Sequence, residues 1–162
     1  MLLPYPIAIG FQNICSLLCA SSFKAVVLAV VALISRRKLA VIVFITFFII
    51  NVYLNSLSKL LFSDPRPFWF STDILQLEWK CPGQFGNPSG HSRSAALFYY
   101  LIINDFIAKY GRPGCGWWAV IVCVWVLVPL SRLALGAHSS NQVLFGMLLG
   151  LAWLVFYRFG LQ

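Results

Sequence analysis

The chain has 162 residues, of which 60% are hydrophobic and only 10% are charged. Soluble domains carry about 25% charged residues, so this composition excludes an ordinary soluble protein and indicates a single domain embedded in a membrane, residues 1–162. The formal net charge is +8, but the basic residues are scattered and do not form the stripe that nucleic-acid binding requires. We therefore expect a lipid bilayer as a partner, and no nucleic acid.

The hydrophobic segments predict an all-α fold, a polytopic bundle of about five transmembrane helices. A helix needs about 20 mostly apolar residues to cross a bilayer, and lipid offers the backbone no other partners than its own. The segments that satisfy this length are residues 14–35, 39–61, 89–109, 115–132 and 139–157.

The basic residues predict the orientation of this bundle. Arg36–Lys38, the pair Lys109 and Arg112, and Arg158 all fall on the same side if the spans alternate, and that side is expected to be cytoplasmic. The opposite side, luminal or extracytoplasmic, then holds the long 62–88 connection and most of the unusual polar residues. The organelle stays open between endoplasmic reticulum and plasma membrane.

Lys24 lies inside the first predicted span. It precedes Arg36 by twelve residues, about 18 Å of helix, which places it deep in the bilayer. An intramembrane lysine is a candidate functional residue. The alternatives are a lysine that extends to the headgroups, or a different position for the first span.

Lys59 and Arg66 form the first polar segment on the non-cytoplasmic side. Pro65 and Pro67 flank the arginine and are expected to end the preceding helix and stiffen the turn. The two cations could bind a phosphate. They could also be interfacial residues next to the aromatic run Phe68–Phe70.

The second polar segment is Pro88-Ser89-Gly90-His91. Ser89 is a good N-cap, Gly90 allows a ligand to approach the backbone, and the free amides of a first helical turn suit a phosphate. An ordinary capped helix with a surface histidine is the alternative. Arg93 could contact a phosphate or extend to the headgroups.

The third polar segment runs from Ser131 to Gln142. Gln142 lies one helical turn after His138, so its oxygen could accept the Nδ1 proton and leave Nε2 as a nucleophile. An interhelical hydrogen bond is the simpler role for Gln142. Gly146 and Gly150 continue the same face and predict close helix packing.

The three segments together favour phosphoryl chemistry. Both histidines of the chain and three cations, Lys59, Arg66 and Arg132, fall on one predicted side of the membrane. Cations offset the charge on phosphate oxygens, while one imidazole attacks phosphorus and the other protonates the leaving oxygen. The acids, cysteines and histidines show no metal-ligand spacing, so we expect metal-independent chemistry without a cofactor.

These motifs resemble the signature of the type 2 phosphatidic acid phosphatase superfamily, whose fold is related to that of the vanadium haloperoxidases. The signature consists of Lys-x6-Arg-Pro, Pro-Ser-Gly-His and Ser-Arg-x5-His-x3-Asp. The matching positions are Lys59 to Pro67, Pro88 to His91 and Ser131 to His138, so the core motifs occupy residues 59–142. The family usually has six helices, so five spans suggest that the chain lacks the usual first helix or is a shortened version.

The resemblance implies a role for each site residue. His138 is the nucleophile that forms a phosphohistidine, and His91 is the general acid and then the base for water. The phosphate-binding residues implied are Lys59, Arg66, Ser89, Gly90 and Arg132. Gln142 stands where the family usually has Asp. Membrane glucose-6-phosphatases of the same superfamily also carry Gln there, and it could still orient His138.

The sequence leaves three functions open. The first is hydrolysis of a lipid phosphate or diphosphate, since the aromatic 62–88 loop could rest at the interface and admit a headgroup. The second is a sugar phosphatase of the glucose-6-phosphatase type, and the third is a non-catalytic protein that binds phosphorylated lipids. The oligomeric state stays open.

Overall fold

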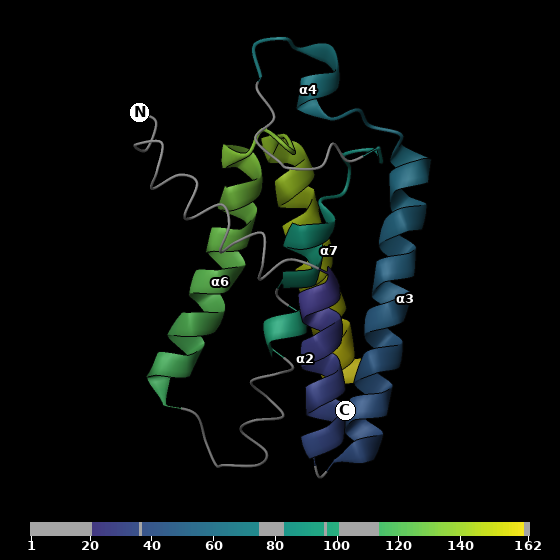
Figure 1. Ribbon diagram of the computed structural model, residues 1–162, viewed down its shortest axis with the longest axis vertical. Helices are drawn as coiled ribbons and strands as arrows, with labels where there is room; N and C mark the ends of the chain where they lie inside the picture. The colour runs from purple at the N-terminus through teal and green to yellow at the C-terminus, as the bar shows by residue number, and fades with distance from the viewer. Residues whose placement is uncertain (1–20, 36, 75–82, 96, 101–113, 161–162) are drawn as a thin grey trace.

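The computed structural model describes residues 21–35, 37–74, 83–95, 97–100 and 114–160. The described residues form helices joined by loops and contain no strand, so the expected all-α fold is confirmed (Figure 1). Residues 90–95 and 97–100 form a further helical segment. The labelled helices are α2 (Ser21–Ile34), α3 (Lys38–Phe62), α4 (Pro67–Phe70), α6 (Cys115–Ala134) and α7 (Ser140–Gly160).

Three of the described helices, α3, α6 and α7, are long and apolar enough to cross a membrane. They correspond to the predicted spans 39–61, 115–132 and 139–157. The helix α2 forms the end of the predicted span 14–35, and the helical segment from residue 90 forms the start of the span 89–109. The remaining parts of these two spans, and Trp79 and Lys80 of the long loop, lie outside the described residues.

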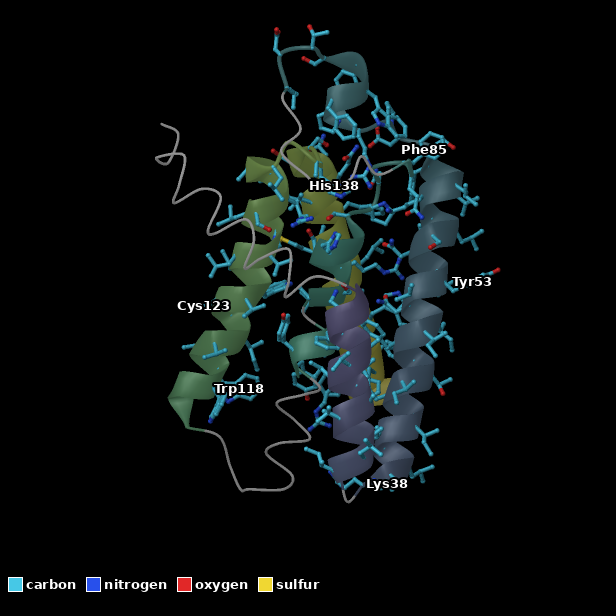
Figure 2. The ribbon with its side chains drawn as sticks, viewed as in Figure 1. Lys38, Tyr53, Phe85, Trp118, Cys123 and His138 are labelled. Carbon is cyan, nitrogen blue, oxygen red and sulfur yellow. The ribbon has the colours of Figure 1, made fainter. Side chains whose placement is uncertain are left out.

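The helices bring the three polar segments to one end of the bundle. Figure 1 shows the end of α3, the end of α6 and the beginning of α7 at the same end of the bundle, the end at which α4 also lies. In Figure 2, His138 and Phe85 lie toward this end, whereas Lys38 lies at the opposite end. The expected separation of the polar motifs from the basic Arg36–Lys38 connection is therefore present in the fold.

An aromatic cluster holds α3, α7 and the segment 97–100 together in the membrane region. Phe47 of α3 lies 4.8 Å from Trp153 and 5.2 Å from Tyr157, both of α7, measured between ring centroids. Phe48 reaches Phe98 of the neighbouring segment at 5.7 Å. Tilted and edge-to-face rings add a directional preference to the burial of apolar area. The cluster thereby fixes how the three helices are arranged below the polar end.

Glycines on α7 allow the segment that begins at Gly90 to pack directly against this helix. A Cβ atom at Gly146 would lie 2.6 Å from the carbonyl oxygen of Ser89, and one at Gly150 would overlap the carbonyl of Arg93. The close packing predicted for these glycines is confirmed. The backbone N–H of Ser89 also donates to the carbonyl oxygen of Gln142 at 3.0 Å, so main-chain atoms join the two helix starts.

Arg93 takes neither of its two expected roles. It is buried, its Nε donates to Oδ1 of Asn51 at 2.8 Å, and its guanidinium lies 5.8 Å from the ring centroid of Trp153. Both the phosphate and the headgroup interpretation are therefore wrong for the described structure. The sequence alone could not show this, because the partners of Arg93 come from α3 and α7.

Candidate active site

The turn after α3 places Arg66 at the polar end of the bundle. Ser63 ends the helix in the left-handed region at φ 45°, and Pro67 opens α4 at its first position, where no N–H is needed. The guanidinium of Arg66 donates to the carbonyl oxygens of Gln84 at 2.7 Å and Ala137 at 2.9 Å. Lys59 donates to the side-chain oxygen of the same Gln84 at 3.1 Å. Gln84, which the sequence did not single out, thus holds both cations.

The hydrogen bonds of Gln142 define the state of His138. The amide nitrogen of Gln142 donates to Oδ2 of Asp64 at 3.0 Å and to the carbonyl of Pro65 at 2.8 Å, while its oxygen accepts from the N–H of Ser139 at 3.2 Å. Because that oxygen can only accept, the Nδ1 atom of His138, 3.3 Å away, must carry the proton. The Nε2 atom of His138 is then left with its lone pair.

The surroundings of His138 keep the ring neutral. Burial first, and then the positive charges of Arg66 and Lys59, lower the pKa of His138 to about 3, against a smaller opposing effect of the hydrogen bond to Gln142. Nη1 of Arg66 lies 3.4 Å from Nε2 of His138. An unprotonated nitrogen beside a guanidinium is the arrangement that a nucleophile needs when its target is an anionic phosphoryl group.

In the Pro-Ser-Gly-His segment, Gly90 and His91 line the cavity described below, whereas Ser89 does not. The Oγ of Ser89 lies 2.9 Å from Oγ of Ser92 and 3.5 Å from its N–H, as in a capped helix start. Ser89 is fully buried in this position. Its expected phosphate contact therefore stays a prediction, whereas the predicted capping interaction is present.

One cavity of about 1050 Å³ brings most of the candidate residues together. Both histidines line it, as do the first two predicted cations and the glycine of the second motif; these are Lys59, Arg66, Gly90, His91 and His138. The predicted residues outside its lining are Ser89, Arg132 and Gln142. Arg132 is buried, and its charge acts on both histidine rings. Within the described ranges, no three His, Cys, Asp or Glu side chains lie together to hold a metal ion.

Asp64 is the main residue of the site that the sequence interpretation missed. Its carboxylate receives the hydrogen bond from Gln142, and its carbonyl oxygen accepts from the N–H of Gly86 at 2.8 Å. A Cβ atom at Gly86 would overlap the Gln142 amide. The available signal was that Asp64 is one of only four acids and lies two residues before Arg66.

Comparison with known proteins gives a family match over most of the chain. A sequence model described as "PAP2 superfamily" matches residues 40–160. The crystal structure of the first transmembrane PAP2 type phosphatidylglycerolphosphate phosphatase from Bacillus subtilis is similar, with a TM-score of 0.73 and 25% identity. The likeness covers 94% of this chain and 74% of the other.

Curated relatives are phosphatases by name. Glucose-6-phosphatase catalytic subunit 1 of Mus musculus is 29% identical over 64% of this chain and 35% of its own length. Undecaprenyl-diphosphatase of Sulfolobus acidocaldarius is 31% identical over 74% of this chain and 53% of its own. Sphingosine-1-phosphate phosphatase 2 of Homo sapiens is 28% identical over 65% and 26%, respectively. The chain spans about a third, 35%, of the glucose-6-phosphatases that it matches.

Proposed function

The chain belongs to the PAP2 superfamily, and from this membership we propose that it is an integral membrane phosphatase acting on a phosphate ester or diphosphate of a lipid. The observation that carries the proposal is the position of His138. Its unprotonated Nε2 lies 3.4 Å from the Arg66 guanidinium, and both residues line one cavity with Lys59 and His91.

The first step transfers the phosphoryl group to the protein. Nε2 of His138 donates its lone pair to phosphorus, and the bond between phosphorus and the leaving oxygen breaks. The negative charge of the bound phosphate favours the imidazolium form of His91, and a proton moves from this ring to the leaving oxygen, so the alcohol or phosphate leaves in its protonated form. Lys59 and Arg66 offset the charge on the phosphoryl oxygens during the transfer.

The second step returns the protein to its starting state. His91, now neutral, accepts a proton from a water molecule while the water oxygen attacks phosphorus. The bond between phosphorus and Nε2 breaks, and its electron pair returns to His138 as inorganic phosphate leaves. Lys59 and Arg66 offset the charge on the phosphoryl oxygens, so the mechanism that we propose requires no metal ion.

Gln142 and Asp64 act as positioning residues in this mechanism. The imidazole of His138 becomes positively charged when phosphorus binds Nε2, and its Nδ1 proton points to the Gln142 oxygen. The amide nitrogen of Gln142 donates to the Asp64 carboxylate at 3.0 Å, so the negative charge of Asp64 polarises the amide oxygen that faces His138. We propose that this pair replaces the direct carboxylate partner that the family motif usually provides.

The shape of the cavity supports a lipid as the substrate. Its lining continues from the cations along α2 and α3 to apolar side chains such as Leu28, Ile45 and Phe48. A sugar phosphate has no apolar group to place there. The second candidate, a sugar phosphatase, rests on the likeness to glucose-6-phosphatase. It also rests on Gln142, which stands where the family motif usually has Asp.

We also propose that the site faces the lumen or the extracytoplasmic space. It lies at the end of the bundle opposite Lys38, which belongs to a basic connection (Figure 2). Basic connections stay in the cytoplasm according to the positive-inside rule. Accessibility of single cysteines introduced at Gly83 and Lys38 in sealed vesicles would test this orientation.

The function is tested by trapping the phosphoenzyme. Purified protein with EDTA is incubated with a ³²P-labelled lipid phosphate and quenched in alkali with detergent, because phosphohistidine is labile to acid. We expect label on the wild-type protein and on a His91→Ala variant supplied with a good leaving group, but none on His138→Ala. Lipid binding without label in any variant would favour the non-catalytic role. Preferential turnover of a sugar phosphate in competition would favour the second candidate.

A further inference from the structure

The cavity contains polar groups beyond those that the proposed mechanism uses. Lys24 and Ser94 line it next to His91, and Asn51 and Asn55 line it on the α3 side. Asn51 and Asn55 precede Lys59 on α3 and so lie farther from the polar end than Lys59 does. Figure 1 shows α2 and α3 running side by side below the polar end.

Lys24 is held beside the histidine that protonates the leaving group. It is 7% exposed, and its ammonium donates to Oγ of Ser94 at 2.8 Å. That hydroxyl lies 3.4 Å from the carbonyl oxygen of His91, one helical turn earlier. Lys24 therefore does not extend to the headgroups, and its charge is among those that act on the His91 ring.

Asn55 lines the same cavity from α3, one helical turn before Lys59. Four residues advance a helix by about 6 Å, so Asn55 lies below Lys59 on the same face. A Cβ atom at Gly90 would lie 2.8 Å from its amide nitrogen, which places the carboxamide against the helix start that carries His91. The Asn55 oxygen is buried without a hydrogen-bond partner, so it can still accept a donor from a ligand.

We propose that Lys24 and Asn55 form a second phosphate subsite on the leaving-group side, so that the preferred substrate is an isoprenoid-type lipid diphosphate. This proposal rests on the proposed function. His138 attacks the terminal phosphorus, the bond to the bridging oxygen breaks, and His91 protonates that oxygen. The leaving group is then a lipid monophosphate, whose charge the Lys24 ammonium stabilises and whose hydroxyl donates to Asn55.

The charge of Lys24 decides between lipid classes. A phosphomonoester leaves as a neutral alcohol and gains little from a buried ammonium beside it. A sphingoid base carries its own ammonium two carbons from the phosphate, and it would meet a like charge in this wall. A diphosphate lipid brings a second anionic group to this position, and its chain continues into the part of the cavity lined by Leu28 and Phe48.

The experiment compares farnesyl diphosphate with farnesyl monophosphate, which have the same chain. Initial rates are measured in detergent micelles by separating the lipid products. For Lys24→Met, we expect the ratio of kcat/KM for the diphosphate to kcat/KM for the monophosphate to fall about 10- to 100-fold, the worth of a hydrogen bond to a charged group, because any effect on His91 is common to both substrates. Lys24→Arg keeps the charge and should retain most of the preference. Lys38→Met removes an exposed lysine that donates to the carbonyls of Ala32 and Leu33, and should change neither rate.

A binding measurement on the unaltered protein covers the case in which Lys24→Met does not fold. A non-hydrolysable farnesyl diphosphonate should compete at least about 10-fold better than farnesyl phosphonate, which corresponds to one charged contact more. Equal inhibition by the two, or an equal loss of both activities in Lys24→Met, would overturn the subsite while leaving the phosphatase intact. No phosphate release and no phosphoenzyme from either substrate would overturn the proposed function itself.

Discussion

The side-chain amide of Gln142 donates to Oδ2 of Asp64 at 3.0 Å, on the far side of Gln142 from the nucleophile candidate His138. The amide of Gln142 therefore connects a carboxylate to the imidazole through two hydrogen bonds. Charge-assisted hydrogen bonds are roughly twice as strong as neutral ones, so the strength of the bond that holds the Gln142 amide depends on the negative charge of Asp64. Four predictions follow from this geometry and its surroundings.

Asp64→Asn should slow phosphoenzyme formation about tenfold, which is about 1.4 kcal/mol of activation free energy. Asparagine retains an oxygen that accepts from Gln142, so the geometry survives while the negative charge that stabilises the forming imidazolium is removed. Rapid-quench measurement of the labelled protein checks this. The matched control is Asp73→Asn, since Asp73 is exposed. Equal rates for wild type and Asp64→Asn would contradict the role of the carboxylate.

Gln142→Asp restores the residue that the family motif usually carries and should nevertheless lower activity, by about tenfold or more. It places two carboxylates at neighbouring positions, and like charges repel at such distances. The double variant Gln142→Asp with Asp64→Asn should recover a large part of the loss. A double-mutant cycle on kcat/KM measures the coupling between the two positions. Additive losses would show that they act independently.

Gly86→Ala should disturb the site more than the fold. The added Cβ would overlap the Gln142 amide, so the amide must move and lose its hold on His138. Overpacking of this kind costs about 1–3 kcal/mol. We expect kcat to fall at least about tenfold. Gly83→Ala is the control on the same loop, because nothing lies within 4 Å of a Cβ there. If both alanine variants retain full activity, Gln142 does not depend on this contact.

His138 should make the fold sensitive to acid. Its pKa is about 3 in the folded protein, because burial and then Arg66 disfavour the imidazolium, against about 6.5 for an unfolded histidine. The unfolded chain thus binds a proton that the folded chain does not. The contribution of the neutral ring is complete above about pH 6.5 and declines as pH falls toward 3, by at most about 1.4 kcal/mol per pH unit.

A His138→Asn variant should flatten that dependence. Thermal unfolding midpoints in detergent at about pH 7 and about pH 5 provide the measurement, with wild type losing more stability than the variant over this interval. If the unfolding midpoint falls equally in the two proteins, other groups determine the loss of stability at low pH.

The sequence predicted the fold class and the packing face of α7 because both depend on local patterns. The hydrophobic segments define α3, α6 and α7, and the glycine spacing on α7 predicts its packing face. The contacts that the sequence missed connect distant segments. Asp64 reaches Gln142 across 78 positions, and Lys24 reaches Ser94 across 70. No periodicity or motif spacing encodes which side chains meet across such separations.

Arg93 shows that a sequence motif can also suggest a ligand contact that the fold does not make. Its place beside the Pro-Ser-Gly-His motif favoured a ligand or a headgroup, yet its bond to Asn51 makes it part of the interior. A residue's position along a helix indicates its depth. The neighbouring helices determine whether it faces lipid, ligand or protein, and those were not visible in one sequence.

The main-chain bond from Ser89 to Gln142 has a consequence for how the protein responds to the surrounding bilayer. The helix that carries His91 and the one that follows His138 are joined by this bond at their first turns. A change in bilayer thickness acts first on the helix ends beyond the aromatic cluster of α3, α7 and residues 97–100, so the span between the imidazoles hardly changes. Turnover should accordingly vary little among lipids of different chain length, even where thermal stability varies strongly.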